Sequence, residues 1–301
     1  MKIKFNPNLD FQREAIDSIV DVFRGQETYQ TNFTVAPLQK SAQMQLDFSE
    51  LGIGNRLKLL EEDILENVRD IQLRNGLRPS DKLNSMDFTV EMETGTGKTY
   101  VYLRTILELH KKYGLSKFII VVPSVAVKEG VMKTLDITKN HFKKLYNSIP
   151  YTYFEYNSRK INKVRNFVFS NHLQIMEMNV QAFNTEDRII NQERDSNNGE
   201  RLIDLLEKIS PVLILDEPQQ GMDTINMRSR RKKLNPLLTL RYSATHKILK
   251  NLIHYLSPYD AYNQSLVKKI EVFSIHESNT QSNVYIGFNE IKLSSDKPQA
   301  Q

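Results

Sequence analysis

The chain has 301 residues, of which 40% are hydrophobic and 26% charged, and its formal net charge is +5. This composition predicts a water-soluble globular protein and excludes a membrane-spanning one, because no apolar run approaches the ~20 residues that a bilayer requires. The absence of cysteine excludes disulfides, thiolate zinc sites and cysteine nucleophiles. The amino terminus lacks the apolar segment of a secretory signal, so we expect a cytoplasmic protein. The basic balance is compatible with a polyanion partner.

Two helices are predicted before the first glycine-rich loop. Apolar side chains recur at helical spacing over residues 9–24, with Asp10 as the N-cap. Gln12 in the first turn has two open interpretations: a solvated polar side chain, or a group that reads the edge of adenine through one donor and one acceptor. Residues 51–75 carry a second apolar stripe, which predicts a helical insertion (about residues 45–78) beside the core.

A glycine-rich stretch, METGTGKT at residues 92–99, lies between a β-prone run and a helix-like run at residues 100–112. A loop in this position that ends in Gly-Lys-Thr is typical of a phosphate-binding P-loop. Its glycines let backbone N–H groups turn onto phosphate oxygens, and the helix N-terminus adds a favourable dipole. Lys98 is predicted to reach the β- and γ-phosphates and Thr99 to hold Mg²⁺. Met92 departs from the glycine that usually opens the motif.

Strands and helices alternate regularly after this loop, which predicts an α/β fold with a mainly parallel central sheet flanked by helices. Residues 118–123 form an apolar, β-branched run typical of a central parallel strand. Ser124 and Lys128 follow at its carboxyl end, where ligands gather in such sheets. The pattern leaves open whether they face the phosphates of a bound nucleic acid or serve as a helix N-cap and a surface lysine.

A second stretch, VLILDEPQ at residues 212–219, delivers two carboxylates to the end of an apolar strand. This arrangement is typical of a Walker B site, in which Asp216 is predicted to hold Mg²⁺ and Glu217 to polarise the attacking water. Ser243 and Thr245 lie at the end of the next predicted strand. Their hydroxyls are predicted to bond the Asp-Glu pair and to sense its state.

Three segments have less specific patterns. The basic run RSRRKK at residues 228–233 is open to two interpretations, a solvated loop and a polyanion contact. Residues 247–269 are predicted to be mainly helical. Residues 294–301 are predicted to form a disordered tail.

Taken together, these stretches resemble superfamily 2 helicase-like ATPases and, within them, the Res subunit of type III restriction-modification enzymes. The Asp-Glu-Pro-Gln and Ser-Ala-Thr-His forms of two motifs are more specific than generic helicase motifs. The resemblance extends across nearly the whole chain. The motifs that carry it lie at residues 11–12, 93–99, 122–130, 180–184, 216–219 and 242–246.

This resemblance implies a RecA-like ATP-binding domain, expected over residues 1–255, and a connection toward a second motor domain over residues 256–301. Family members bind ATP and Mg²⁺ between two such domains and move along double-stranded DNA. They cut the DNA with a nuclease domain, in complex with methyltransferase (Mod) subunits. They are far longer than this chain, in which no second-motor motif with an arginine finger and no nuclease carboxylate cluster is recognisable. We therefore expect the chain alone to bind ATP weakly and to hydrolyse it very slowly.

The resemblance also implies a role for each matching residue. Lys98, Asp216 and Glu217 are expected to be catalytic, and Ser243 and Thr245 to couple the site to movement. The expected nucleotide-binding residues are Gln12, Thr94, Gly95, Thr96, Gly97, Lys98 and Thr99.

Other functions stay open from the sequence. One is a different superfamily 2 motor, such as a repair or RNA helicase, although the Pro-Gln after Asp-Glu argues against the most familiar RNA helicase pattern. Another is a truncated protein that binds nucleotide or a partner without turnover of its own. A small-molecule P-loop kinase is disfavoured, because such kinases lack the Ser-Ala-Thr strand end.

Overall fold

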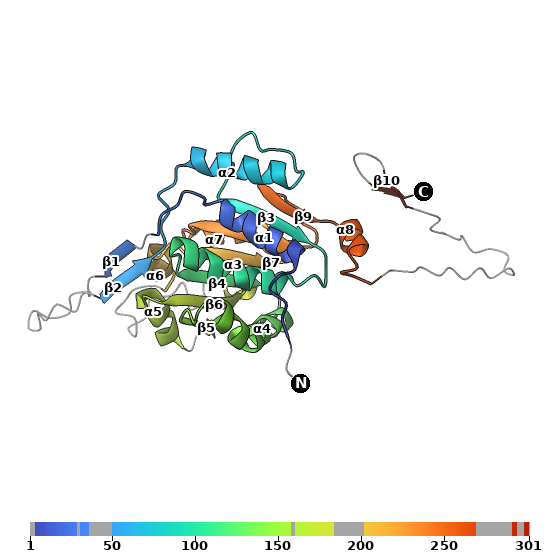
Figure 1. Cartoon of the computed structure of the whole chain (residues 1–301). Coiled ribbons are helices and arrows are strands. Elements are labelled where there is room, and N and C mark those ends of the chain that lie inside the picture. Colours follow the sequence, from blue (N-terminus) through green and yellow to red (C-terminus); the bar gives the residue numbers. More distant parts are fainter. Residues whose placement is uncertain are drawn as a thin grey trace, which may run out of the picture. The chain divides into compact units, whose positions relative to one another are not determined.

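The computed structural model describes residues 4–28, 31–35, 50–157, 160–183, 202–268, 291–293 and 298–300. At its centre lies a seven-stranded sheet in the order β5-β6-β4-β7-β8-β3-β9, in which every neighbouring pair is parallel (Figure 1). The strands are β3 (Asp87–Met92), β4 (Lys117–Val122), β5 (Tyr151–Glu155), β6 (Leu173–Asn179), β7 (Val212–Asp216), β8 (Leu238–Ser243) and β9 (Leu252–Leu256). The predicted α/β fold with a parallel central sheet is confirmed.

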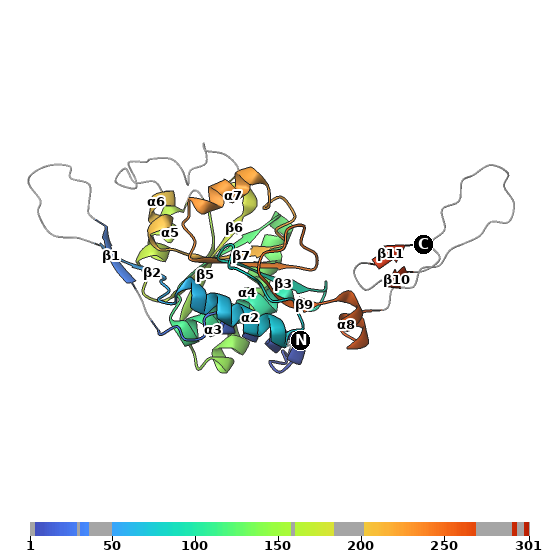
Figure 2. The ribbon, with the colours of Figure 1, turned by 90° about the horizontal axis from the view of Figure 1, so that it is seen from above.

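Helices cover both faces of this sheet (Figures 1 and 2). One face carries α1 (Asp10–Asp21), α3 (Lys98–Tyr113) and α4 (Val125–Leu145), and α2 (Glu61–Arg74) packs on α1 and β9. The opposite face carries α5 (Ile161–Phe169), α6 (Leu202–Lys208) and α7 (Ile225–Lys232). Because helices shield both faces, β4 and β7 are buried at every position, which explains their apolar runs at residues 118–122 and 212–215.

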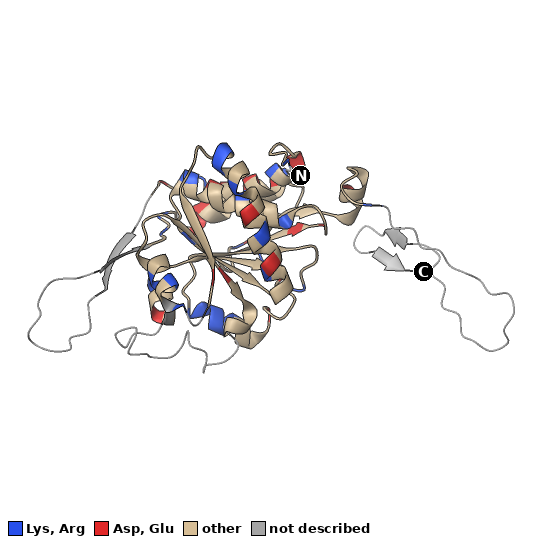
Figure 3. Cartoon of the chain, turned by 90° about the horizontal axis from the view of Figure 1, so that it is seen from below, with Lys and Arg blue, Asp and Glu red and all other residues tan. Residues whose placement is uncertain are grey.

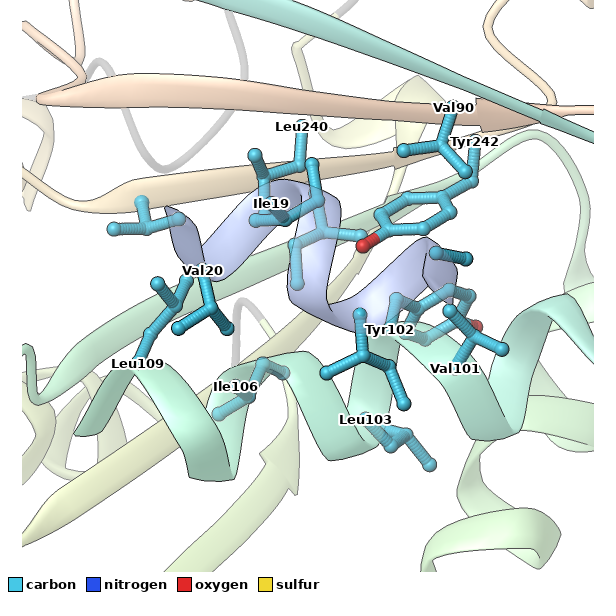
Figure 4. Close-up of a cluster of buried hydrophobic side chains, with 14 of the residues drawn as sticks. Ile19, Val20, Val90, Val101, Tyr102, Leu103, Ile106, Leu109, Leu240 and Tyr242 are labelled. Atoms are coloured by element: carbon cyan, nitrogen blue, oxygen red, sulfur yellow. The ribbon is translucent and has the colours of Figure 1, made fainter. Parts of the chain in front are cut away.

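The larger hydrophobic cluster lies where α1 and α3 meet the sheet (Figure 4). Ile19 of α1 and Ile106 of α3 are fully buried there. The rings of Tyr102 on α3 and Tyr242 on β8 lie 5.5 Å apart between their centroids. Burial of each large aliphatic side chain stabilises the fold by about 1.5–3 kcal/mol. This cluster therefore fixes α3, and with it the loop that precedes α3, against the middle of the sheet.

The helix predicted over residues 51–75 is wrong in its first part. Strand β2 (Glu50–Gly54) pairs antiparallel with β1 (Thr31–Val35), and α2 begins only at Glu61. Glycines at positions 52 and 54 explain the difference, because each costs about 1 kcal/mol inside a helix. Leu60, which the apolar stripe includes, is 65% exposed. The predicted N-cap Asp10 is likewise the first helical residue, and the cap position belongs to Leu9.

The helix predicted over residues 247–269 is also wrong in its first part, before the break expected near Ser257-Pro258. Strand β9 pairs with β3 at the edge of the sheet, and the helix α8 (Pro258–Asn263) is short. Ser257 ends the strand and begins the helix, since its side chain accepts a hydrogen bond from the backbone N–H of Asp260. A five-residue apolar run does not show by periodicity whether it forms a strand or a helix, and the pairing with β3 decides it here.

Contacts divide the chain into two compact units, Met1–Val267 and Lys268–Gln301. In the second unit, β10 (Ile291–Leu293) pairs antiparallel with β11 (Pro298–Ala300), so the tail predicted to be disordered contains a strand held by backbone hydrogen bonds. A short 3₁₀ helix, η1 (Val180–Phe183), follows β6 in the first unit. Among the described residues, no helix is long and apolar enough to cross a membrane.

Candidate functional site

The carboxyl ends of β3, β7 and β8 lie side by side at one end of the strands, which we call the carboxyl edge of the sheet. The sequence motifs are found there. In the strand order, β8 lies between β7 and β3, so the loop after β3 and the acidic pair after β7 are separated by a single strand. Parallel strands place their carboxyl ends at the same edge, where α/β proteins bind ligands. The predicted P-loop and the predicted Walker B carboxylates therefore face one another across the end of β8.

The loop between β3 and α3 has the backbone of a phosphate cradle. Gly95 and Gly97 have φ angles of 84° and 90°, in the left-handed region that residues with a side chain seldom adopt. Thr96 closes the turn, because its hydroxyl donates to the backbone oxygen of Glu93 at 2.6 Å. Helix α3 begins at Lys98 immediately after this turn, so its first N–H groups and its positive dipole end lie at the loop.

Gln12 on α1 supports this loop from behind. Its Nε2 donates to the backbone oxygen of Thr96 at 2.9 Å, and the residue is only 7% exposed. A Cβ atom added at Gly97 would lie 2.7 Å from Gln12 Nε2. Glycine therefore suits position 97 for two reasons: its φ angle and the close approach of Gln12 to its Cα. In this structure Gln12 contacts the loop itself, which neither interpretation from the sequence anticipates.

Lys98 links the loop to the acidic pair. Its Nζ lies 3.3 Å from Glu217 Oε1 and donates to the backbone oxygen of Met92 at 3.3 Å. The side chains of Lys98 and Glu217 are 12% and 20% exposed, so the ion pair is partly shielded from water. The ammonium group therefore lies between the backbone at the end of β3 and the acidic pair.

The two carboxylates of the acidic pair have opposite pKa shifts. Burial, reinforced by the neighbouring charge of Glu217, raises the pKa of Asp216 to about 6. Tyr102 of α3 donates its hydroxyl to Asp216 Oδ2 at 3.2 Å, which moderates the rise. Carboxylates with separated pKa values are suited to different tasks in one site. The charged form of Asp216 is therefore destabilised by burial, and a nearby cation would stabilise it.

Glu217 is held charged by several contacts. Burial alone would raise its pKa, but hydrogen bonds from Ser243 and Gln219 and the charge of Lys98 hold the pKa below its ordinary value. Gln219 Nε2 donates to Glu217 Oε2 at 2.6 Å, and Ser243 Oγ donates to the same oxygen. The backbone of Glu217 has a φ of 51°, an uncommon conformation for a residue with a side chain and frequent at functional sites. Its N–H is fixed by the backbone oxygen of Tyr242 at 2.9 Å.

The residues at this edge fit a nucleotide with Mg²⁺. The Asp216 carboxylate and the Thr99 hydroxyl supply hard oxygen donors, which Mg²⁺ prefers. No cluster of three or more His, Cys, Asp or Glu that could hold a metal exists in the described part of the chain. Two left-handed glycines and a helix N-terminus supply the phosphate cradle.

Comparison with known proteins identifies the family. The family model described as "Type III restriction enzyme, res subunit" matches residues 9–248. The chain belongs to this family. The Res subunit of the enzyme EcoP15I from Escherichia coli is 29% identical over 287 residues, which cover 87% of this chain and 28% of that protein. The Res subunit of EcoPI from Escherichia phage P1 is 28% identical over 289 residues, which cover 88% of this chain and 28% of that protein.

The chain thus spans about 28% of the length of the curated relatives it matches. Among solved structures, a nuclease-deletion mutant of the type ISP restriction-modification enzyme LlaGI in complex with a DNA substrate mimic is 12% identical. The match covers 69% of this chain and 21% of the LlaGI chain, with a TM-score of 0.42. The fold assignment depends on the strand order and not on that likeness.

Not every predicted site residue of this Res-family chain lies at the acidic pair. Ser243 contacts Glu217, whereas Thr245 is exposed and its backbone N–H donates to Ser243 Oγ at 3.1 Å. Ser124 caps α4 by accepting from the backbone N–H of Val127. Lys128 forms an ion pair with Glu155 at 2.5 Å. The structure therefore gives both nucleic-acid candidates local partners, and their contact with a bound strand stays a prediction.

The structure adds residues to the site that the sequence analysis did not assign. Tyr102 follows Lys98 by one helical turn, and residues four apart share a helix face, so spacing places Tyr102 on the face of Lys98 but does not name Asp216 as its partner. Gln219 lies two residues after Glu217 in the acidic motif, but the pattern gives its side chain no direction. His246 contacts Glu91 Oε1 through both its backbone N–H, at 2.8 Å, and its ring Nδ1, at 3.0 Å. Only the pairing of β3 with β8 brings these two together.

Proposed function

We propose that this chain is the ATP-binding motor portion of a type III restriction enzyme Res subunit, which couples ATP hydrolysis to movement on double-stranded DNA ahead of cleavage. The observation that carries the proposal is the convergence of Lys98 with Asp216 and Glu217 at one sheet edge, across the end of β8. Family membership supports the same function. The nuclease, the second motor domain and the Mod partner belong to the longer relatives, and their participation is part of the proposal.

The residues of the site take the following roles in this proposal. Loop N–H groups and Lys98 bind the β- and γ-phosphates, and Asp216 and Thr99 hold Mg²⁺. When bound, Mg²⁺ neutralises charge that develops between these phosphates. Glu217, kept ionised by its hydrogen bonds, orients and polarises the attacking water.

The same contacts suggest how the site is kept inactive before nucleotide binds. Lys98 pairs with Glu217 at 3.3 Å, so a phosphate must draw Lys98 away before Glu217 is free to face a water. Gln12 is positioned to transmit the state of the loop to α1, and it reaches adenine only if its bond to Thr96 is exchanged. Ser243 bridges Glu217 and the segment at Thr245, which makes it the coupling residue in this proposal.

Catalysis also needs charge stabilisation on the γ-phosphate, which an arginine finger supplies in related motors. Within the described residues we assign no arginine to this role. We therefore propose that the chain alone binds nucleotide and turns it over slowly, and that rapid turnover requires a second domain. Rapid DNA-stimulated hydrolysis by the purified chain would contradict this part of the proposal.

Nucleotide titration tests the central proposal. We expect Lys98→Ala to weaken binding of a non-hydrolysable ATP analogue with Mg²⁺ by roughly ten- to a hundredfold, the range given by one or two charge-assisted hydrogen bonds. Lys111→Ala is the matched control, because Lys111 is exposed on the same helix. Equal affinities of wild type and Lys98→Ala would remove the proposal.

The alternative function is another superfamily 2 motor acting on single strands or RNA. A full-length relative separates the two, because its ATP turnover can be measured with duplex DNA, single-stranded DNA and RNA in turn. Stimulation by duplex DNA supports a restriction-enzyme motor. Stimulation confined to RNA or to single strands supports the alternative.

A further inference from the structure

The basic run at residues 228–233 does not form the loop that one interpretation of the sequence expects. Most of it belongs to α7, which begins at Ile225 and ends at Lys232 (blue segments in Figure 3 mark Lys and Arg). Arg228, Arg231 and Lys232 are spaced three and four residues apart, so they share one face of the helix. The helix therefore directs these three basic side chains toward the body of the protein.

This face lines a cavity of about 450 Å³. The cavity lies at the amino ends of β3 and β8, the sheet edge opposite the P-loop, since Asp87 begins β3 and Pro236 precedes β8. Its described lining contains four cations, Arg228, Arg231, Lys232 and Lys250, and one carboxylate, Asp87. The hydroxyls of Ser85 and Ser229 lie in the same lining.

The positive charge of the cavity is only partly compensated. Asp87 forms an ion pair with Lys250, whose Nζ lies 2.6 Å from Asp87 Oδ2. The nearby Asp223 is occupied by Arg241, which forms two hydrogen bonds to it at 2.8 and 2.9 Å. Within the described parts of the chain, no carboxylate lies in ion-pair distance of Arg228, Arg231 or Lys232. An excess of positive charge therefore faces the cavity.

Arg231 is built into the fold, and Arg228 is partly buried. Arg231 is only 6% exposed, and its NH1 donates to the backbone oxygen of Met222 at 2.6 Å. Burial, together with the charge of Arg241, lowers its pKa. Arg228 Nε is shielded from solvent and has no hydrogen-bond partner among the described residues. A buried donor without a partner is costly, and an anion placed here would satisfy it.

We propose that this cavity binds a phosphate group, at a site separate from the P-loop. Guanidinium, ammonium and hydroxyl donors converge there, and these are the groups that bind phosphate oxygens in proteins. The phosphate comes from one of two sources, a free phosphorylated molecule or the backbone of duplex DNA. The inference does not depend on the proposed motor function, since it involves the opposite sheet edge.

The test uses Lys98→Ala protein, in which anion binding at the P-loop is weakened. Binding of pyrophosphate and of a 12-base-pair duplex is measured at low salt, because phosphate contacts weaken as salt rises. Arg228→Gln combined with Lys232→Gln removes two cavity donors and leaves the buried Arg231 in place. Lys143→Gln combined with Lys144→Gln is the matched control, since both are exposed on α4.

We expect the cavity variant to weaken binding of at least one probe tenfold or more, with the control pair unchanged. A specific loss for pyrophosphate supports the site and shows that a free phosphate is sufficient. A specific loss confined to the duplex supports the site and assigns it to the DNA backbone. Failure of both probes to bind, unchanged binding of both by the cavity variant, or an equal loss in the control pair would overturn the proposal.

Discussion

Buried charged side chains have different kinds of partner at the carboxyl edge and at the amino edge of the central sheet. At the carboxyl edge, Lys98 is close to a carboxylate and remains 12% exposed in its side chain. At the amino edge, Lys117 is fully buried, and its Nζ donates to the backbone oxygens of Phe167 and Ser170 at the end of α5. Asn55 fixes the same edge through hydrogen bonds to the backbone of Ser116 and Lys117.

This difference shows which charges can be exchanged. Lys98 can change partners, because a ligand phosphate can replace the carboxylate of Glu217 without leaving a backbone group unsatisfied. Lys117 cannot, because it satisfies carbonyl groups that have lost contact with water. The first edge is therefore suited to a binding cycle, whereas Lys117 attaches α5 permanently to β4. The predictions below test that contrast.

The largest expected effect is a pH dependence caused by Lys117. Burial lowers the pKa of Lys117 to about 7 from an ordinary value of 10.5. Between these values the unfolded chain holds a proton that the folded chain has lost, so the free energy of unfolding rises with pH. One pKa unit corresponds to about 1.4 kcal/mol, so the rise is ~5 kcal/mol across this window. We expect Lys117→Met to remove it in urea denaturation from pH 7 to 10.

The matched control for that experiment is Lys111→Met, which changes an exposed lysine and should keep the wild-type slope. The slope is the informative quantity, because Lys117→Met also leaves two backbone oxygens without their donor. Equal slopes in wild type and Lys117→Met would show that Lys117 is not buried as described.

A second pH effect of opposite sign is expected from Glu177 on β6. Glu177 is 1% exposed and neither carboxylate oxygen has a hydrogen-bond partner among the described residues. Burial raises its pKa to about 8, against the lowering effect of Lys128 and with a further rise from Glu155. Here the folded chain holds the extra proton, so the free energy of unfolding falls as pH rises from about 4.5 toward 8.

We expect Glu177→Gln to reduce this fall and to raise stability at pH 8 by ~4 kcal/mol relative to wild type. Glu129→Gln, an exposed residue on α4, serves as the control and should behave as wild type. Denaturant melts at pH 5 and pH 8 measure the effect. A Glu177→Gln protein that loses stability at pH 8 would show that the carboxylate has a partner outside the described residues.

A third prediction uses two glycines with similar backbones. Gly97 and Gly221 have φ angles of 90° and 94°, but a Cβ at Gly97 meets Gln12, whereas one at Gly221 meets nothing within 4 Å. Both alanine variants should lose ~1 kcal/mol from the left-handed backbone. We expect Gly97→Ala to lose ~1 kcal/mol more and to weaken nucleotide binding about tenfold. Stability should recover in part when Gln12→Ala is added, and equal losses at both glycines would contradict the role of Gln12.

The smallest expected effect concerns Ser243. Ser243→Ala removes a hydrogen bond to the ionised Glu217, which should cost ~1.5 kcal/mol and let the pKa of Glu217 rise. The side chain of Thr245 makes no such contact with Glu217 in the described structure, so Thr245→Ala should cost less than ~0.5 kcal/mol. Chemical denaturation at neutral pH compares the two. Equal small losses would argue that Ser243 does not read the state of Glu217.

The sequence predicted the layers of this fold better than the order of its strands. Continuous apolar runs identified β4 and β7, because strands shielded on both faces need no polar positions. The run at residues 252–256 was misread as helix, since its identity as an edge strand depends on β3, which lies more than 150 residues earlier in the chain. Local patterns carry no information on that pairing.

The same limit applies to the candidate site. The spacing of the two motifs was enough to predict that Lys98 and the acidic pair share one sheet edge. It was not enough to place Gln12 behind the loop or His246 beside Glu91, because both contacts join segments brought together only by the completed sheet. Tyr102 was missed for another reason, since a helix tyrosine is usually core and its hydroxyl partner is invisible in the sequence.

The position of β3 has a consequence for synthesis of the protein on the ribosome. β3 pairs only with β8 and β9 in the central sheet, and both are translated long after it. While residues 93–237 emerge, the strand that leads into the phosphate loop therefore has no hydrogen-bonded neighbour on either side. Unpaired strand edges invite association with other chains. The nascent chain must protect this strand until β8 and β9, which end at Ser243 and Leu256, leave the exit tunnel.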